Sequence, residues 1–583
     1  MKSTFFTILF LFIAYSPTFS QNNPLTGFDE LVKEVMTDWQ VPGMGIGIVK
    51  DGKVILAKGY GFRDMAKKLP VDKNTLFAIG SCTKAFTAAG VAQAVDDRQL
   101  DFDKPVISYF PSFKMYDDYT TQHITFRDML SHRSGLPRHD FAWYGANKSR
   151  EDLFNALQYL EPNADFRTTW QYQNIMFMTA GYLIGQQYNQ TWEEFIENHI
   201  FEPLDMNNSN FSIKTSQKSD NHALPYQLTD EKVEEMDFRN IDAIGPAGSI
   251  NSTINDMNNW LMMHLNKGQF KDKIIISEGN FQQMHQPQMI MPGAMSDEIY
   301  YRSYGMGWML TSYRGNFRSE HGGNIDGFSA NVGFLPRAGI GVVILTNMNG
   351  TSAPSIIRNS IFDRLLGIER IDWNKKLKDG RDKSKKVAKE LDNDNDPLRK
   401  NNTVPSHPIV DYVGDFEHPA YGKIEIKAVD NNLIMDIRGK EIELEHYHYD
   451  IYRVKSASIF KGKKFTFHSS KNGDINKISA SLQAGVKDII FERVANINNV
   501  DYNLYIGDFE LAGQATRFYV ENGVLKLSVP PQPVYELELK NDHSFSIKGA
   551  EGFLIVFDIK NGKPAQSVIF NQPNGTFTAK RKQ

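Results

Sequence analysis

The first residues of this chain whose types and spacing could carry out chemistry are Ser81 and Lys84, in the stretch IGSCTKAFTAAG. The residues after them have a helical pattern, and positions i and i+3 of a helix lie on one face, one turn apart. A serine hydroxyl becomes nucleophilic when a base takes its proton. A lysine amine can be that base if burial or a nearby charge lowers its pKa from about 10.4. The spacing therefore predicts either a catalytic serine–lysine pair or a helix N-cap followed by a solvated lysine.

Two more polar residues open a second helical stretch, WQYQNIMFMTAGYLIG. Beside a lysine, Tyr172 could relay protons, and the side-chain amide of Asn174 could hydrogen-bond an acyl carbonyl. Further on, His321 precedes Gly322 and Gly323, and paired glycines let a backbone approach a substrate closely. Taken alone, such a tyrosine is more often a packed aromatic, and such a histidine is more often structural.

Other candidate sites are weaker. Cys82, the only cysteine, is expected to point away from the face shared by Ser81 and Lys84, so we interpret it as a small helix residue and not as a nucleophile. His446 and His448 would share one face of a strand, but two ligands without a third indicate a solvent-facing strand. The sequence therefore predicts no metal site and no cofactor.

These residues need a sheet and helices to position them. Two β-rich runs flank Asp51-Gly52, which is a strong hairpin signal. A second pair of apolar strands flanks residues 336–339, and a helix follows over 354–366. Because mostly helical segments lie between the two hairpins, we expect an α/β (α+β) domain, with one antiparallel sheet built from both ends of the domain and a large helical insertion.

Composition changes beyond this domain. Residues 375–400 are charged and nearly devoid of apolar side chains, which predicts an exposed linker. The alternation after Pro405 is typical of strands, and YVGDF at 412–416 recurs as YIGDF at 505–509. Two small all-β modules are expected, as barrels or sandwiches. The predicted boundaries are a signal peptide at 1–20, a sheet-and-helix domain at 21–372, a linker at 373–408 and β modules at 409–495 and 496–583.

The N-terminus and the composition indicate where the protein works. Lys2 followed by a short apolar core and small residues near Ser20 is typical of a secretory signal peptide. With that segment removed we expect a periplasmic or secreted protein that has no stable membrane anchor. A net charge of −4 is too small to suggest a nucleic-acid partner. The sequence carries no indication of an oligomeric state.

In order and approximate spacing, Ser-Cys-Thr-Lys 81–84, Tyr172-Gln173-Asn174 and His321-Gly322-Gly323 resemble the motifs of the serine β-lactamase-related hydrolases. This family includes class C β-lactamases, D-Ala-D-Ala carboxypeptidases of the penicillin-binding type, D-aminopeptidases and esterases. Residues 124–137 and 245–261 also look like family segments. The resemblance covers about residues 28–366 and implies a β-lactamase/transpeptidase-like fold, and the β modules resemble the lipocalin-like domains of some members.

The resemblance implies an acyl-enzyme mechanism. Ser81 would attack a carbonyl, Lys84 with Tyr172 would move its proton to the leaving group, and Asn174 would position the substrate. The backbone N–H groups of Ser81 and Asn324 would form the oxyanion hole, and His321, Gly322 and Gly323 would line the substrate site.

The third motif departs from the family pattern. β-Lactamases and carboxypeptidases of the family usually have Lys-Thr-Gly there, which binds a substrate carboxylate, whereas this chain has His321-Gly322-Gly323. The expected activity is hydrolysis of small esters or amides, with D-amino-acid peptides among the candidate substrates. The alternatives are a carboxypeptidase or β-lactamase acting on peptidoglycan peptides or β-lactams, and a noncatalytic binding protein that keeps the scaffold.

Overall fold

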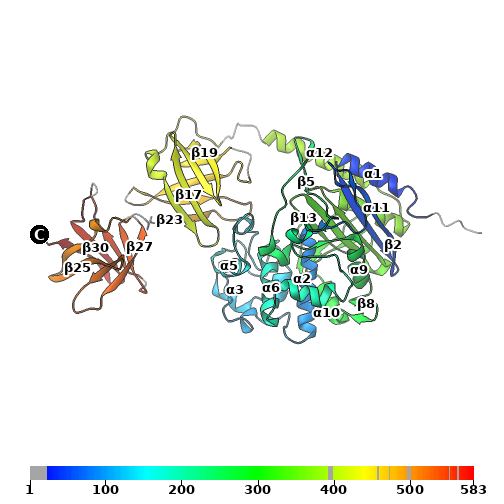
Figure 1. Ribbon diagram of the computed structural model, residues 1–583, viewed down its shortest axis with the longest axis horizontal. Helices are drawn as coiled ribbons and strands as arrows, with labels where there is room; N and C mark the ends of the chain where they lie inside the picture. Colours follow the sequence, from blue (N-terminus) through cyan, green and yellow to red (C-terminus); the bar gives the residue numbers. More distant parts are fainter. Residues whose placement is uncertain are drawn as a thin grey trace, which may run out of the picture.

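The computed structural model describes residues 23–391, 398–455, 459–471, 473–494, 500–541, 543–550, 552–560 and 563–582. The predicted signal peptide, residues 1–20, lies outside these ranges. Within them the chain forms a sheet-and-helix domain followed by two closed β-barrels (Figure 1). Among the helices in the described ranges, none combines the length and the apolar character that crossing a membrane requires.

The central sheet has nine antiparallel strands and joins the two ends of the domain, as predicted. β1 (Gly43–Lys50) lies between β2 (Lys53–Asp64) and β15 (Ile340–Thr346), with Ile46 opposite Ile344. The remaining strands are β3 (Leu69–Pro70), β10 (Met289–Ile290), β11 (Arg302–Tyr304), β12 (Met309–Tyr313), β13 (Asn316–Ile325) and β14 (Phe328–Leu335).

Alternation along β1 lets helices cover both faces of the sheet. Gly47 faces α9 (Ile254–Leu265), where an added Cβ would lie 2.4 Å from the Asn258 Oδ1, so only a glycine allows this approach. The intervening isoleucines point to the opposite face and form a separate apolar core. That core is completed by α1 (Phe28–Asp38) and α11 (Ala353–Leu366).

The helical insertion packs against the α9 side of the sheet. Two of its helices, α2 (Thr83–Asp96) and α6 (Asn174–Tyr188), are apolar on nearly every side, and nearly all their residues are buried. The others are α3 (Asp118–His123), α4 (Phe126–Leu130), α5 (Arg150–Asn155), α7 (Trp192–Ile196), α8 (Ile213–Ser216) and α10 (Glu278–Met284). Short hairpins pair β4 (Phe77–Ala78) with β7 (Asn251–Ser252), β5 (Tyr226–Thr229) with β6 (Lys232–Glu235) and β8 (Gln269–Phe270) with β9 (Lys273–Ile274).

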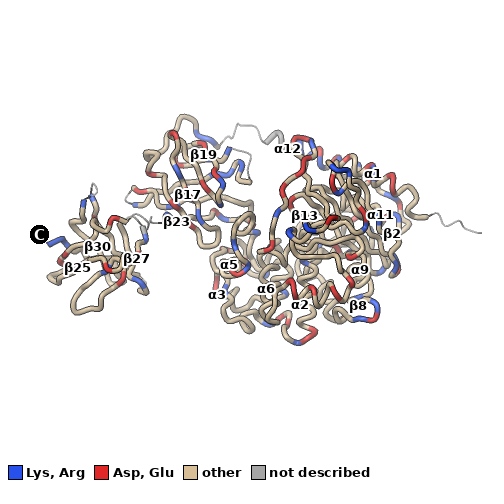
Figure 2. The backbone as a smooth tube through the Cα atoms, in the orientation of Figure 1, with Lys and Arg blue, Asp and Glu red and all other residues tan. Residues whose placement is uncertain are grey.

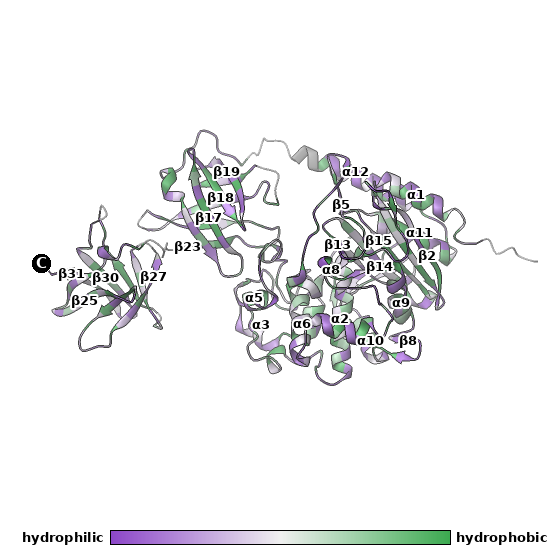
Figure 3. Ribbon diagram, viewed as in Figure 1, coloured by the Kyte–Doolittle hydropathy of each residue, from purple (hydrophilic) through white to green (hydrophobic). Residues whose placement is uncertain are grey.

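The charged segment begins as a helix, α12 (Trp373–Leu391), which Figure 3 colours mostly hydrophilic. Its first turn is docked on the sheet-and-helix domain, because the Trp373 Nε1 donates to the Asp363 Oδ2 at 2.8 Å. The Lys378 Nζ also lies 2.8 Å from the Asp38 Oδ1. Lysine and arginine positions alternate with acidic ones over all three units (Figure 2), in line with the small net charge.

The β modules are two closed eight-stranded barrels. Barrel 1 comprises β16 (Gly414–His418), β17 (Gly422–Val429), β18 (Asn432–Ile437), β19 (Lys440–His448), β20 (Ile451–Val454), β21 (Lys464–Ser469), β22 (Ile475–Ala480) and β23 (Ile489–Val494). Barrel 2 comprises β24 (Gly507–Leu511), β25 (Gln514–Glu521), β26 (Val524–Ser528), β27 (Tyr535–Asn541), β28 (Ser544–Ile547), β29 (Leu554–Phe557), β30 (Ser567–Gln572) and β31 (Gly575–Arg581).

The repeated pentapeptide opens both barrels in the same way. Phe416 in the first strand of barrel 1 is buried, and the guanidinium of Arg493, from the closing strand, lies 5.0 Å from its ring centroid. In barrel 2, Arg581 lies 4.8 Å from the ring of Phe509. The sequence repeat is therefore a structural repeat that fixes where each barrel closes.

Candidate active site

Ser81 lies where a short strand leads into a long buried helix. β4 pairs with β7, and the 3-10 turn Gly80–Cys82 then continues into α2. The Lys84 Nζ lies 3.1 Å from the Ser81 Oγ, so the one-turn spacing brings the amine and hydroxyl into contact. The side chain of Lys84 is fully buried, which excludes the alternative of a solvated lysine beside a helix cap.

Two carbonyl oxygens lie next to the Lys84 amine. The Asn174 Oδ1 is 2.7 Å from Nζ and the backbone oxygen of Ala247 is 2.8 Å away. Because both oxygens can only accept, they take the two N–H groups of a neutral amine and leave its lone pair for the Ser81 hydroxyl. Burial, reinforced by the Arg138 guanidinium, lowers the pKa of Lys84 well below its usual value and favours this neutral form.

Ala247 reaches the amine because the turn Asp242–Ala247 is wedged between α2 and α6. The hydroxyl of Thr87, on α2, donates to the backbone oxygen of Pro246 at 2.6 Å. On α6, a Cβ added to Gly181 would lie only 2.4 Å from the Pro246 Cβ. A small residue on one helix and a hydrogen bond from the other therefore hold this turn in place.

Tyr172 lies beside the same amine, as the sequence predicts. Its ring centroid is 4.7 Å from the Lys84 Nζ. Burial raises the pKa of the Tyr172 phenol above its usual value, although a hydrogen bond to Ser81 partly opposes that rise. At neutral pH the phenol is therefore protonated and suited to passing a proton on, not to acting as a phenolate.

His321 is buried and hydrogen-bonded through both ring nitrogens. Its Nδ1 lies 2.6 Å from the backbone oxygen of Gly322, which can only accept, so Nδ1 carries the proton. Its Nε2 then accepts from the Tyr304 hydroxyl at 2.9 Å. Burial lowers the pKa of His321 to about 3, so the third motif supplies no cation at neutral pH.

Two glycines allow the third motif to touch the turn that carries Ser81. A Cβ on Gly323 would lie 1.9 Å from the backbone oxygen of Ile79, and one on Gly80 would lie 2.8 Å from the backbone nitrogen of Asn324. The Asn324 side chain accepts from the backbone N–H of Gly350 at 2.8 Å, so it holds a neighbouring loop. The backbones of the Ser81 turn and of Asn324 therefore meet where the oxyanion hole is predicted.

Two residues of this site, Arg138 and Asp140, were not predicted from the sequence. The Arg138 guanidinium lies 5.0 Å from the ring of Tyr172, and its Nε donates to the Asp140 Oδ2 at 2.6 Å. The Asp140 Oδ1 in turn accepts from the side-chain amide of Asn174 at 3.0 Å. Neither residue belongs to a recognisable motif, and only the fold brings them to Asn174.

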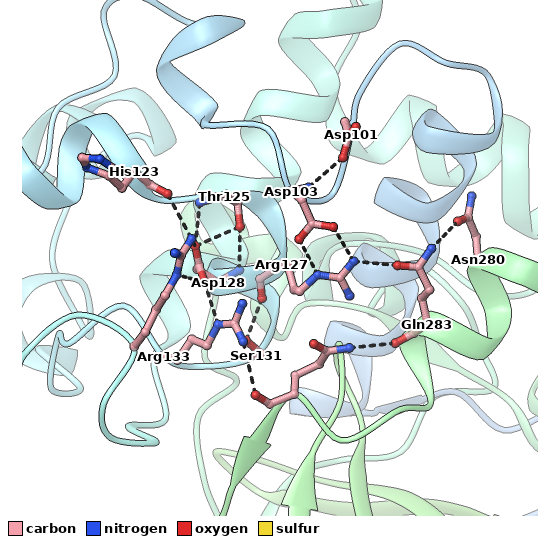
Figure 4. A network of polar contacts seen from close by, with 12 residues as sticks. Asp101, Asp103, His123, Thr125, Arg127, Asp128, Ser131, Arg133, Asn280 and Gln283 are labelled. Carbon is pink, nitrogen blue, oxygen red and sulfur yellow. Dashed lines mark hydrogen bonds and ion pairs between the residues drawn. The ribbon is translucent and has the colours of Figure 1, made fainter.

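An ion-pair network supports the segment that precedes these residues (Figure 4). The buried carboxylate of Asp128 accepts from the Arg133 Nε at 2.6 Å and from the Arg167 Nη2 at 2.8 Å. Through this network α4 is tied to the turn that contains Arg167, ahead of α6. The ring of His132, in the same segment, accepts from the backbone N–H of Gln173 at 3.0 Å and so fixes the residue between Tyr172 and Asn174.

Cavities open on two sides of Ser81. The larger has a volume of about 900 Å³ and is lined by Tyr172, His321, Asn324 and also by Ala484 and Gly485 of barrel 1. The smaller has a volume of about 190 Å³ and is lined by Asn174, Asp140 and Asp326 among others. A substrate carbonyl at Ser81 would therefore have room for one group on each side.

The weaker candidates have ordinary structural contacts. Cys82 is buried, burial raises its thiol pKa to about 12, and its Sγ lies 3.3 Å from the backbone oxygen of His321. The His446 Nε2 lies 2.8 Å from the backbone oxygen of Tyr449, and the His448 Nδ1 accepts from the backbone N–H of Lys400. In the part of the chain that the structure describes, no three His, Cys, Asp or Glu side chains are grouped to hold a metal ion.

Comparisons with known proteins match the two parts of the chain to two family models. The family model for beta-lactamase matches residues 28–361, and a model described as a domain of unknown function, DUF3471, matches residues 398–493. The chain is 30% identical to the unguisins hydrolase ungD' of Aspergillus campestris, covering 70% of this chain and 79% of that one. It is 26% identical to protein flp of Staphylococcus aureus, covering 58% and 66%.

Among solved structures, the chain is similar to an octameric penicillin-binding protein homologue from Pyrococcus abyssi. The TM-score is 0.53 at 20% identity, and the similarity covers 88% of this chain and 99% of the other. At this identity the likeness shows the fold alone.

The neighbouring glycines of the third motif provide a matched pair of variants. Gly323→Ala should destabilise the protein by about 1–3 kcal/mol because its Cβ would overlap the backbone of Ile79. At Gly322 the nearest atoms to an added Cβ are 3.8 Å away, so Gly322→Ala should change the free energy of unfolding by less than about 0.5 kcal/mol. Denaturant unfolding measures both, and equal losses would contradict the close approach.

Proposed function

The chain belongs to the β-lactamase family, and within that family of hydrolases we propose that it is an exported serine hydrolase whose acyl-enzyme forms on Ser81. The proposed substrates are small esters or amides, with D-amino-acid peptides among them. The proposed site of action is the periplasm or the medium outside the cell, on the strength of the N-terminal residues 1–20.

The observation that carries the proposal is the contact between Ser81 and a buried lysine whose two N–H groups are already taken. With Asn174 and Ala247 accepting those hydrogens, the free lone pair of Lys84 lies 3.1 Å from the serine oxygen. A neutral amine in this position is a general base for the hydroxyl proton. A binding protein has no need of such a base, which disfavours the noncatalytic alternative.

The proposed reaction has two steps, acylation of Ser81 and hydrolysis of the acyl-enzyme. Ser81 Oγ bonds to the substrate carbonyl carbon while Lys84 accepts the hydroxyl proton, and the developing oxyanion is bound by the backbone N–H groups of Ser81 and Asn324. The proton then moves, with the neutral phenol of Tyr172 as relay, to the leaving oxygen or nitrogen as its bond to the carbonyl breaks. Water then attacks the acyl carbon, its proton passes through Tyr172 and Lys84 to the Ser81 Oγ, and the bond between Oγ and the acyl carbon breaks, which releases the acid and restores the serine.

The proposed substrate class is supported by the third motif and the cavities. His321 is neutral and hydrogen-bonded on both sides, so it offers no charge to a substrate carboxylate. Arg138 lines the larger cavity and carries a positive charge, but its guanidinium is already paired with Asp140. These features favour neutral esters and amides over β-lactams and carboxylate-terminated peptides.

Replacing the nucleophile tests the proposal directly. Ser81→Ala should abolish ester turnover and labelling by a fluorophosphonate, because no acyl-enzyme can form, while the Tm stays unchanged. Intact mass of the labelled protein and hydrolysis of p-nitrophenyl acetate are the two measurements. Unlabelled wild-type protein, or full activity in the variant, would favour a noncatalytic binding protein.

The buried amine predicts a pH profile. A base whose pKa is lowered is neutral above that pKa, so kcat/KM should rise with pH and level off well below pH 10.4, the ordinary lysine value. Lys84→Arg should lower kcat by about 10²–10⁴-fold, because a guanidinium stays protonated throughout. A rising limb centred near pH 10.4 in the wild-type enzyme would contradict a neutral buried lysine.

Reaction with a penicillin distinguishes the proposed function from the carboxypeptidase and β-lactamase alternatives. After mixing, intact mass should show no adduct on Ser81 and the drug should remain unconsumed, because no cation binds its carboxylate. A persistent adduct would instead indicate a carboxypeptidase, and rapid consumption of the drug would indicate a β-lactamase.

A further inference from the structure

Barrel 1, which corresponds to the matched domain of unknown function, touches the active site directly. The loop between β22 and β23 carries Gln483, Ala484 and Gly485. Ala484 and Gly485 line the same cavity as Ser81 and Tyr172. A wall of the cavity is therefore formed by a different unit of the chain from the one that holds the nucleophile.

Gln483 of this loop makes two hydrogen bonds to one residue of the site. Its Oε1 accepts from the backbone N–H of Asp140 at 2.9 Å, and its Nε2 lies 3.3 Å from the Asp140 Oδ2. Asp140 also accepts from Arg138 and from the Trp143 indole at 3.0 Å, but those two residues belong to its own segment. Gln483 is thus the residue of barrel 1 that hydrogen-bonds Asp140 itself.

The orientation of the Asn174 amide depends on Asp140. A carboxylate can only accept, so its oxygen 3.0 Å from the Asn174 Nδ2 holds the NH₂ end of the amide toward itself. The carbonyl end then faces the Lys84 amine at 2.7 Å. With the amide reversed, Lys84 would lose an acceptor for one N–H, and its lone pair would no longer be directed at Ser81.

Barrel 1 also grips the residues on both sides of Asp140. The buried ring of His139 lies between the Tyr421 hydroxyl, 2.8 Å from Nδ1, and the backbone oxygen of Glu161, 3.0 Å from Nε2. The guanidinium of Arg438 donates to the backbone oxygens of Phe141 and Tyr144. His139 has a left-handed φ of 47°, a conformation that these contacts help to hold.

Building on the proposed function of Ser81, we propose that barrel 1 is a working part of the active site, in which Gln483 positions Asn174 through Asp140 and so keeps the Lys84 amine turned toward Ser81. Gln483 touches no reacting atom and acts as a positioning residue. The matched domain of unknown function thereby gains a role in this chain.

The test compares full-length variants by the rate at which a fluorophosphonate labels Ser81. Gln483→Met keeps the length of the side chain and removes its donor and acceptor. We expect about tenfold slower labelling, because the two hydrogen bonds from Gln483 to Asp140 no longer contribute to positioning the base. Intact mass against time gives the rate, and p-nitrophenyl acetate should show the loss in kcat more than in KM.

A second variant gives a readout that a purely structural role would not change. Gln483→Glu keeps an acceptor for the Asp140 N–H but adds a negative charge beside the Asp140 carboxylate. Negative charge favours the ammonium form of Lys84, so the rising limb of the labelling rate should move to higher pH by about half a unit or more. The charged and titratable groups that face Lys84 are Cys82, His132, Arg138, Asp140, Tyr172 and His321.

Lys487→Ala is the matched control. Lys487 lies on the same loop and pairs with the side-chain carboxylate of Glu161 at the surface, whereas it is the backbone oxygen of Glu161 that contacts His139. The labelling rate of Lys487→Ala, and the pH at which that rate rises, should match those of the wild-type protein. If Gln483→Met and Lys487→Ala slow labelling equally, docking of the barrel and not Gln483 is responsible, and the inference is overturned.

Two other results distinguish a failure of the inference about Gln483 from a failure of the proposed function. In the first, the wild-type protein is labelled, Gln483→Met is labelled at the same rate, and the pH at which the labelling rate rises is the same in Gln483→Glu. This result overturns the inference and leaves the proposed function standing. A wild-type protein that neither reacts with the probe nor hydrolyses the ester overturns the proposed function, and the inference falls with it.

Discussion

The sheet-and-helix domain depends on one requirement. The uncharged amine of Lys84 must be buried with both of its N–H groups hydrogen-bonded and its lone pair directed at Ser81. Burial alone would make Lys84 neutral but would leave its direction free. Direction comes from two oxygens on different elements, the Asn174 side chain at the start of α6 and the Ala247 carbonyl on the turn against α2. The tight glycine contacts, the apolar character of both helices and the carboxylate of Asp140 all serve to keep those two oxygens in place.

The third motif is uncharged and lies close to the nucleophile. His321 is on β13, where the Tyr304 hydroxyl and the backbone oxygen of Gly322 use both of its ring nitrogens. Gly323 allows the close approach of β13 to the Ser81 turn, because a Cβ there would lie 1.9 Å from the backbone oxygen of Ile79. A neutral side chain and a close backbone contact therefore stand side by side on this strand.

Local signals in the sequence were enough to predict much of the fold. Asp51-Gly52 predicts the β1–β2 hairpin because both residues adopt the positive φ that this turn needs, and the repeated pentapeptide predicts two related barrels. Ser81, Lys84 and Tyr172 could be paired from helical spacing and family resemblance. Asp140 and Gln483 could not, because each is an ordinary polar residue whose partner lies in a distant segment, and no local pattern records such a contact.

The pairing of β1 with β15 has a consequence for how the protein assembles. β1 ends at Lys50 and β15 begins at Ile340, so one edge of the β1–β2 hairpin stays unpaired until the chain is made as far as Thr346. Joining ends that are so far apart in sequence has a large entropic cost, and long-range strand pairing is slow to form. An exposed edge rich in isoleucine and valine is meanwhile open to pairing with other chains. Newly made protein is thus most prone to aggregate before its last sheet strand arrives, and a chaperone that shields β1 would be of most use during that interval.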